Sequence, residues 1–238
     1  MPLIDAAPHG RPLEVREVDL GGPHVLLGWL LRALWSQVFN PDQSWCGLRL
    51  WESGIVLARY LLAQEIPSGL AVLELGSGCG IAGLAVAAFL APASIFLTDG
   101  NERTIKNLAL NVAASASCVT RVPTVERFVW GVDRCPGGRK FDLVIGSDLF
   151  YSKAAALQLA AAIDECLCEG GKAVLVAPAN RSDESQTRDD FKRTMTDRRF
   201  LVTERAVEFP TGVRIGREEL SHDGEFEVLQ CRREAGGI

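Results

Sequence analysis

Two groups of residues in this chain have types and spacings suited to chemistry. The first is the run ELGSGCG at residues 74–80, followed by Asp99, which comes 23 residues after Gly76. Glycines at a strand-to-helix turn let the backbone approach a ligand closely and direct its amide groups into a pocket. A carboxylate at the end of the next strand can accept hydrogen bonds from both hydroxyls of a ribose. This group therefore predicts a site for a cofactor that contains a nucleoside.

The second group is the pair Asp148 and Tyr151, three residues apart after another apolar run. A carboxylate at the end of a strand next to the pocket can accept hydrogen bonds from an amine and orient it. A nearby phenol can offer the same nitrogen its hydroxyl or its ring face. Two simpler interpretations remain open, because Asp148 could cap the following helix and Tyr151 could pack in the core.

The glycine run does not by itself select the nucleoside. Residues 78–83 also satisfy the dinucleotide pattern G-x-G-x-x-G, and a turn that only packs a strand on a helix remains possible. A nicotinamide enzyme normally has a second domain, whereas only about 60 residues follow the fifth expected strand. The three histidines (His9, His24 and His222) lie near the chain ends, so none is an obvious partner for hydride transfer.

The elements that would position these residues alternate between strands and helices from residue 71 onwards, which is typical of a parallel sheet with crossover helices. Strands are expected at 71–76, 94–99, 121–128, 141–147 and 172–177, and helices at 79–90, 102–114 and 154–168. A polar loop at 180–186 and a helix at 187–197 are expected next. Two final strands, at 200–209 and 225–231, are predicted to form an antiparallel pair at one edge of the sheet.

Composition excludes several classes of protein. The 238 residues are enough for one large domain, and the 25 basic and 30 acidic residues give a net charge of −5 without long like-charge runs. This balance argues against a protein that grips nucleic-acid phosphates. The seven cysteines form no C-x-x-C pair, which favours reduced thiols and no metal site. The longest apolar stretch, 25–39, is short, contains Arg32 and is predicted to be an amphipathic helix rather than a membrane span.

The run ELGSGCG, followed by Thr98 and Asp99, resembles motifs I and II of the seven-strand S-adenosylmethionine-dependent methyltransferases. The resemblance covers roughly residues 45–232. It implies an α/β fold, a Rossmann-like three-layer αβα sandwich with sheet order 3-2-1-4-5-7-6 and strand 7 antiparallel. It also implies S-adenosyl-L-methionine as cofactor, S-adenosyl-L-homocysteine as product, and no metal.

Three further segments are similar to protein-lysine methyltransferase family 16: GLRLWESG at 47–54, FVWG at 128–131, and SDLFY at 147–151, which matches the D-x-x-Y signature. Segments 98–107 and 171–178 look like the calmodulin-lysine methyltransferases. The segment around Trp51 and the tetrapeptide 148–151 are closer to the methyltransferase-like and elongation-factor-lysine members. The family is thus indicated while the substrate stays open.

The resemblance implies methyl transfer to the ε-amine of a lysine in a specific protein, and it assigns roles to named residues. Asp148 and Tyr151 are the implied catalytic residues. The implied cofactor-binding residues are Trp51, Glu74, Gly76, Ser77, Gly78, Gly80, Asp99, Trp130 and Ser147. Ordinary core packing is the alternative interpretation of Trp51 and Trp130.

We expect residues 1–45 to form an N-terminal extension or helical cap and residues 46–233 to form the methyltransferase domain. Segments 13–45, 179–187 and 210–224 are expected to recognise the substrate. We further expect a monomeric cytoplasmic or nuclear protein, a protein partner presenting a lysine, and no membrane or nucleic-acid partner. The alternatives are a methyltransferase for a small molecule or nucleic acid, and a non-catalytic scaffold that binds S-adenosylmethionine.

Overall fold

The computed structural model describes residues 46–48, 50–179, 182–208, 213–215, 218–220 and 225–233. The expected helix at 25–39 and the expected cap at 1–45 lie outside the described residues. No helix in the described part of the chain has both the length and the apolar character that crossing a bilayer requires.

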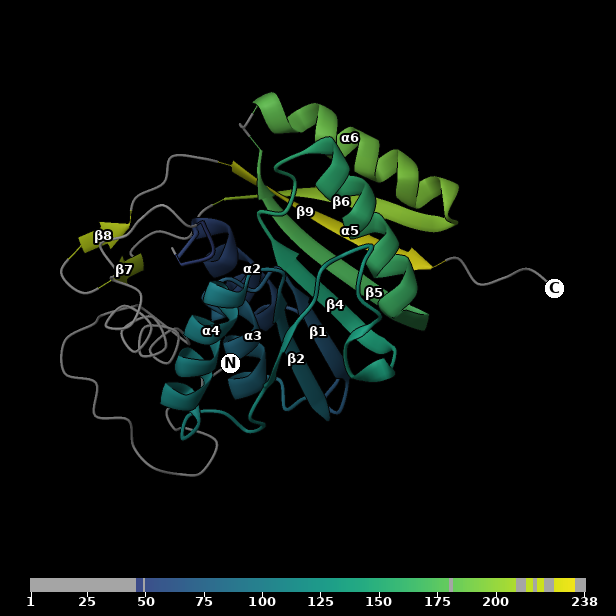
Figure 1. Cartoon of the computed structure of the whole chain (residues 1–238). Helices are drawn as coiled ribbons and strands as arrows, with labels where there is room; N and C mark the ends of the chain where they lie inside the picture. The colour runs from purple at the N-terminus through teal and green to yellow at the C-terminus, as the bar shows by residue number, and fades with distance from the viewer. Residues whose placement is uncertain are drawn as a thin grey trace.

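The centre of the molecule is a seven-stranded sheet in the order β3-β2-β1-β4-β5-β9-β6 (Figure 1). Strands β1 to β5 pair in parallel, and β9 runs antiparallel to both of its neighbours, β5 and β6. The strands are β1 (Ala71–Leu75), β2 (Ser94–Asp99), β3 (Thr124–Arg127), β4 (Phe141–Ser147), β5 (Leu167–Pro178), β6 (Phe200–Glu208) and β9 (Glu225–Arg233). This confirms the predicted order, with β9 as the seventh strand of the sheet.

Helices cover both faces of the sheet (Figure 1). Helices α2 (Glu52–Leu62), α3 (Ile81–Phe89) and α4 (Glu102–Ser115) pack on one face, and α5 (Lys153–Cys166) and α6 (Ser182–Asp197) pack on the other. Successive side chains of a strand point to opposite faces. Val72 accordingly joins the core under α2 and α3, whereas Leu73 and Leu75 join the core under α5 and α6. Both faces are apolar, which explains why the strands appear as continuous hydrophobic runs.

Several element boundaries differ from those predicted. Helix α5 ends at Cys166 rather than at residue 168, because Leu167 already pairs with Phe141 of β4, so Cys168 lies in β5. Helix α6 begins at Ser182, within the expected polar loop, and β3 begins only at Thr124. The expected rim segment 210–224 contains a small hairpin of β7 (Val213–Ile215) and β8 (Glu218–Leu220). The polar composition of the first turn of α6 led to the wrong prediction of a loop, because Ser, Asp and Glu are common in loops and are also favoured in the first turn of a helix.

Candidate functional site

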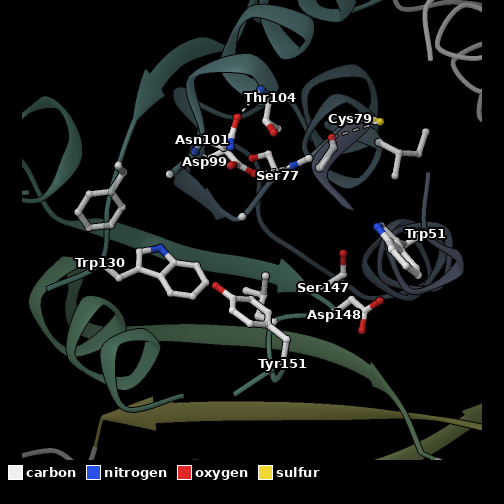
Figure 2. A pocket seen from close by; sticks show the side chains of 18 of the residues that line it. Trp51, Ser77, Cys79, Asp99, Asn101, Thr104, Trp130, Ser147, Asp148 and Tyr151 are labelled. Carbon is white, nitrogen blue, oxygen red and sulfur yellow. Dashed lines mark hydrogen bonds between the residues drawn. The ribbon is translucent and has the colours of Figure 1, made fainter. Parts of the chain in front are cut away.

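A cavity of about 580 Å³ lies at the carboxyl ends of β1, β2, β3 and β4. This edge of a parallel sheet is where ligands bind in open α/β folds, and the volume is in the range of small-molecule sites. Nine of the eleven residues with predicted roles line the cavity, several of them labelled in Figure 2: Trp51, Gly76, Ser77, Gly78, Asp99, Trp130, Ser147, Asp148 and Tyr151. Glu74 and Gly80 are not among the lining residues.

The glycine turn between β1 and α3 is built from left-handed backbone. Gly76 and Gly78 have φ of +58° and +54°, a region that L side chains rarely adopt. The turn is tied to β2, because the Ser77 amide donates to the Thr98 carbonyl (2.7 Å) and the Ser77 hydroxyl accepts from the Thr98 amide (2.9 Å). Ser77 therefore fixes the shape of the turn as well as lining the cavity.

Glu74 lies behind the turn, not in the cavity wall. Its side chain is 2% exposed, and one carboxylate oxygen accepts a hydrogen bond from the Gly83 amide in the first turn of α3 (3.2 Å). Burial raises the pKa of Glu74 to about 8, against the lowering effect of its hydrogen bonds from Ser77 and Gly83. The carboxyl group thus connects β1 to α3 directly beneath the glycine turn.

Asp99 faces the cavity from the end of β2. One of its oxygens accepts from the Gly78 amide (3.3 Å) and the other from the Asn101 amide (2.9 Å). Burial raises its pKa, while these backbone hydrogen bonds oppose the increase. Each carboxylate oxygen can accept more than one hydrogen bond, so Asp99 keeps the capacity to bind the hydroxyls of a ligand.

Asp148 directly follows β4 and has an unusual backbone conformation. Its φ is +58°, uncommon for a residue with a side chain, and its amide donates to the Val176 carbonyl of β5 (2.9 Å). The N-cap of α5 is Ser152, whose hydroxyl accepts from the Ala155 amide (3.1 Å), so Asp148 does not cap that helix. Such backbone positions are frequent at functional sites, where neighbouring structure holds them in place.

Tyr151 is an exposed wall of the cavity rather than a core residue. Its side chain is 66% exposed, which excludes the core-packing interpretation. Partial burial, and then the charge of Asp99, raise its pKa, so the phenol keeps its proton at neutral pH. Figure 2 shows its hydroxyl directed towards Trp130, whereas Asp148 lies towards Trp51. The two side chains therefore face different parts of one cavity.

The two tryptophans border the cavity on opposite sides in Figure 2. Trp130 is 9% exposed and also belongs to the core under α5, so it is both a packing residue and a cavity wall. Trp51 immediately precedes α2 and occupies its N-cap position. The remaining three tryptophans of the sequence lie outside the described residues.

Several lining residues were missed by the sequence analysis, among them Asn101, Thr104, Val129, Leu149 and Gln158. Asn101 could have been found, because an asparagine before a helical run is a typical N-cap, and its side chain accepts from the Arg103 and Thr104 amides. Gln158 carries no such signal, because only the packing of α5 against the loop at Gly131 brings it to the site.

The chain is similar to known proteins in both sequence and fold. A family model described as lysine methyltransferase matches residues 36–197. The chain is 27% identical over 211 residues to protein-lysine N-methyltransferase EFM3 of Chaetomium thermophilum, covering 84% of this chain and 60% of that protein. It is 33% identical over 150 residues to the electron transfer flavoprotein beta subunit lysine methyltransferase of Danio rerio, covering 60% and 52%. The chain thus spans little more than half the length of these relatives.

Among solved structures, a putative RNA methyltransferase from Pyrococcus horikoshii shares the fold, with a TM-score of 0.61 at 15% sequence identity. The match covers 90% of this chain and 98% of that one. At this identity the similarity concerns the fold alone.

Proposed function

The chain belongs to the lysine methyltransferase family, and on that premise we propose that it transfers the methyl group of S-adenosylmethionine to the ε-amine of a lysine in a protein substrate. The observation that carries the proposal is one cavity that combines a glycine turn, the Asp99 carboxylate and the Asp148 carboxylate at the edge of the sheet. The first two suit the cofactor, and the third suits an amine.

The lining residues fit this cofactor. Gly76 and Gly78, both left-handed, place no side chain between the backbone and a bound methionine moiety, and Asp99 has acceptor capacity for the two ribose hydroxyls. Trp130, together with the backbone near Ser147, offers a flat apolar wall for the adenine, and Trp51 closes the outer side. When bound, S-adenosylmethionine supplies an electrophilic methyl group on a positively charged sulfur.

The protein's part in the reaction is to position the nucleophile. A lysine amine has a pKa near 10.4 in water and must be neutral to attack, so a cavity with apolar and aromatic walls favours the reactive form. The Asp148 carboxylate would accept a hydrogen bond from the amine and hold the nitrogen lone pair in line with the methyl–sulfur bond. Proximity and orientation of this kind lower the barrier to transfer. Tyr151, still protonated at neutral pH, would border the channel through which the side chain enters.

Binding and transfer should respond differently to two substitutions. We expect Asp99→Ala to weaken the binding of S-adenosylmethionine by about 10- to 100-fold, because hydrogen bonds to a charged group are lost. Asp148→Asn should keep affinity within about threefold and reduce methyl transfer by at least about 100-fold. Asparagine is the suitable replacement, because it tolerates the φ of +58° at this position.

The experiment combines calorimetry with radiolabelled transfer. Each variant is titrated with S-adenosylmethionine and then incubated with methyl-labelled cofactor and a cell lysate, and labelled proteins are digested to locate the methylated residue. Asp197→Asn, an exposed carboxylate on α6, is the matched control. Absence of cofactor binding, label on a residue other than lysine, or loss of binding in the Asp148 variant instead of the Asp99 variant would each contradict the proposal.

A further inference from the structure

One wall of the cavity is carried by a turn that leaves the edge of the sheet. Strand β3 has four residues, and its one neighbour among the described strands is β2. Its last residue, Arg127, is the register partner of Asp99. The next three residues, Phe128, Val129 and Trp130, all line the cavity. Because a single neighbouring strand supports this segment, its position depends on the side chains that fasten it.

Asp133 closes the turn that carries Trp130. The amides of Val132 and Asp133 both donate to the Val129 carbonyl (3.1 and 2.9 Å). In the opposite direction, one carboxylate oxygen of Asp133 accepts from the Val129 amide (2.8 Å). A hydrogen bond from an amide to a carboxylate is stronger than one between neutral groups. Backbone and side chain of Asp133 therefore hold Val129 together, and Trp130 lies within the closed turn.

Arg127 connects this turn to the end of β2. Its Nε donates to the Gly100 carbonyl (3.2 Å), and its Nη1 lies 3.7 Å from the same Asp133 oxygen that accepts from Val129. The planar guanidinium directs several donors at fixed angles, so one side chain can serve both partners. Gly100 directly follows Asp99 and also lines the cavity. Arg127 thus joins the segment that bears the Asp99 carboxylate to the turn that bears Trp130.

The network lies outside the cavity and is partly open to solvent. Neither Arg127 nor Asp133 is among the lining residues, and their side chains are 49% and 35% exposed. An ion pair with this exposure contributes little to the stability of the whole protein. Its contacts are nevertheless made to the backbone of two cavity walls. Loss of these contacts should therefore loosen the walls locally while the sheet stays folded.

The two walls would contact the two halves of one nucleoside. Under the proposed function, Trp130 borders the adenine and Asp99 binds the ribose, and both side chains border the cavity in Figure 2. Base and sugar are joined by one bond, so the walls must keep a matching separation. We propose that Arg127 and Asp133 are positioning residues that set this separation before the cofactor binds. The inference rests on the proposed function, and it explains binding by a preorganised site.

Substitutions at Asp133 separate its role as an acceptor from its charge. Asp133→Ala leaves the Val129 amide without its side-chain acceptor, and we expect the affinity for S-adenosylhomocysteine to fall by about 5- to 20-fold. Asp133→Asn retains an oxygen that can accept from this amide, so its affinity should stay within about threefold of the unmodified protein. This recovery by asparagine is expected only if the acceptor is what matters.

A second substitution tests the connection to β2 independently. Arg127→Ala removes the donor to the Gly100 carbonyl, and we expect affinity to fall by about 3- to 10-fold. Arg134→Ala is the matched control, because Arg134 is an exposed arginine of the same loop. Its affinity should equal that of the unmodified protein.

The experiment is calorimetric titration of the full chain with two ligands. One is S-adenosylhomocysteine, and the other is 5′-deoxy-5′-methylthioadenosine, which keeps the nucleoside and lacks the amino-acid part. Each variant should lose affinity for both ligands by the same factor, because the affected walls contact only the nucleoside. The midpoint of thermal unfolding without ligand should stay within about 2 °C of the unmodified protein, as expected for an exposed pair.

The outcomes distinguish this inference from the proposed function. Unchanged affinity in both Asp133→Ala and Arg127→Ala would overturn the inference alone. The same follows if Asp133→Asn is as weak as Asp133→Ala, or if the loss is confined to S-adenosylhomocysteine. An unmodified protein that binds neither ligand would contradict the inference and the proposed function together. Binding without transfer to lysine would contradict the proposed function alone.

Discussion

Glu74 is a carboxyl group enclosed between β1 and α3, 2% exposed and bonded to the Gly83 amide. In the unfolded chain it titrates near 4.5, whereas in the folded protein burial raises its pKa to about 8. Between these values the folded state retains a proton that the unfolded state has released. The stabilisation is complete below about pH 4.5 and is lost as the pH rises through 8.

The expected contribution is on the order of a few kcal/mol at the acidic end of this window. Glu74→Gln keeps the size of the side chain and removes the titration. We therefore expect the midpoint of thermal unfolding of the unmodified protein to fall relative to that of Glu74→Gln as the pH is raised from 5 to 9, measured by circular dichroism. Subtracting the two profiles cancels the contributions of all other titrating groups. Two parallel profiles would show that Glu74 does not cause the pH dependence of stability.

Asp148 and Tyr151 show how far single residues could be predicted. Their types and spacing indicated a site, and both line the cavity. Their orientations were not predictable, because they depend on the φ of +58° at Asp148 and on where α5 begins. Neither feature can be predicted from the sequence of residues 148–151, since Asp adopts many backbone conformations.

At the scale of elements, α3 lies so close to the sheet that its first turn has no room for a side chain at Gly83. A Cβ there would lie 2.5 Å from a Glu74 carboxylate oxygen and even closer to a Leu97 methyl group. Alanine normally stabilises a helical position relative to glycine by about 0.5–1 kcal/mol. Here the contact with two neighbouring strands reverses that sign.

We therefore expect Gly83→Ala to lower the free energy of unfolding by about 1–3 kcal/mol, as overpacking does in cores. Urea denaturation followed by tryptophan fluorescence measures the difference. Gly100→Ala is the matched control, because the nearest atoms to its Cβ would be 3.8 Å away, an ordinary contact. Equal or greater stability of the Gly83 variant would mean that α3 can move away from the sheet.

Sequence patterns predicted every strand and every α-helix from β1 to α5, because continuous apolar runs and glycine turns are local signals. The boundaries at α5 and α6 were wrong for a physical reason. Residue 167 follows a helical pattern, yet its partner Phe141 is distant in the sequence and draws it into the sheet. A pairing between residues so far apart in the sequence cannot be predicted from local patterns.

At the scale of the whole molecule, β9 holds the edge of the sheet together. It pairs with β5 on one side and with β6 on the other, and it buries Phe226, Val228, Leu229 and Cys231. We expect a chain that stops after residue 224 to lose cooperative unfolding in urea and its near-ultraviolet circular dichroism. A chain that stops after Arg233, which keeps every described strand, should retain both. Cooperative unfolding of the shorter chain would show that β5 and β6 are stable without β9.

The place of β9 also sets an order of events during synthesis. Of the described strands it is the last to leave the ribosome, yet its position lies inside the sheet rather than at the edge. Until it arrives, β5 presents an unpaired edge and β6 has no strand to bind, a state that favours association with other chains. The pairing of β9 with both neighbours is therefore the step that removes these exposed edges, and we expect it to follow the emergence of residues 225–233 from the ribosome.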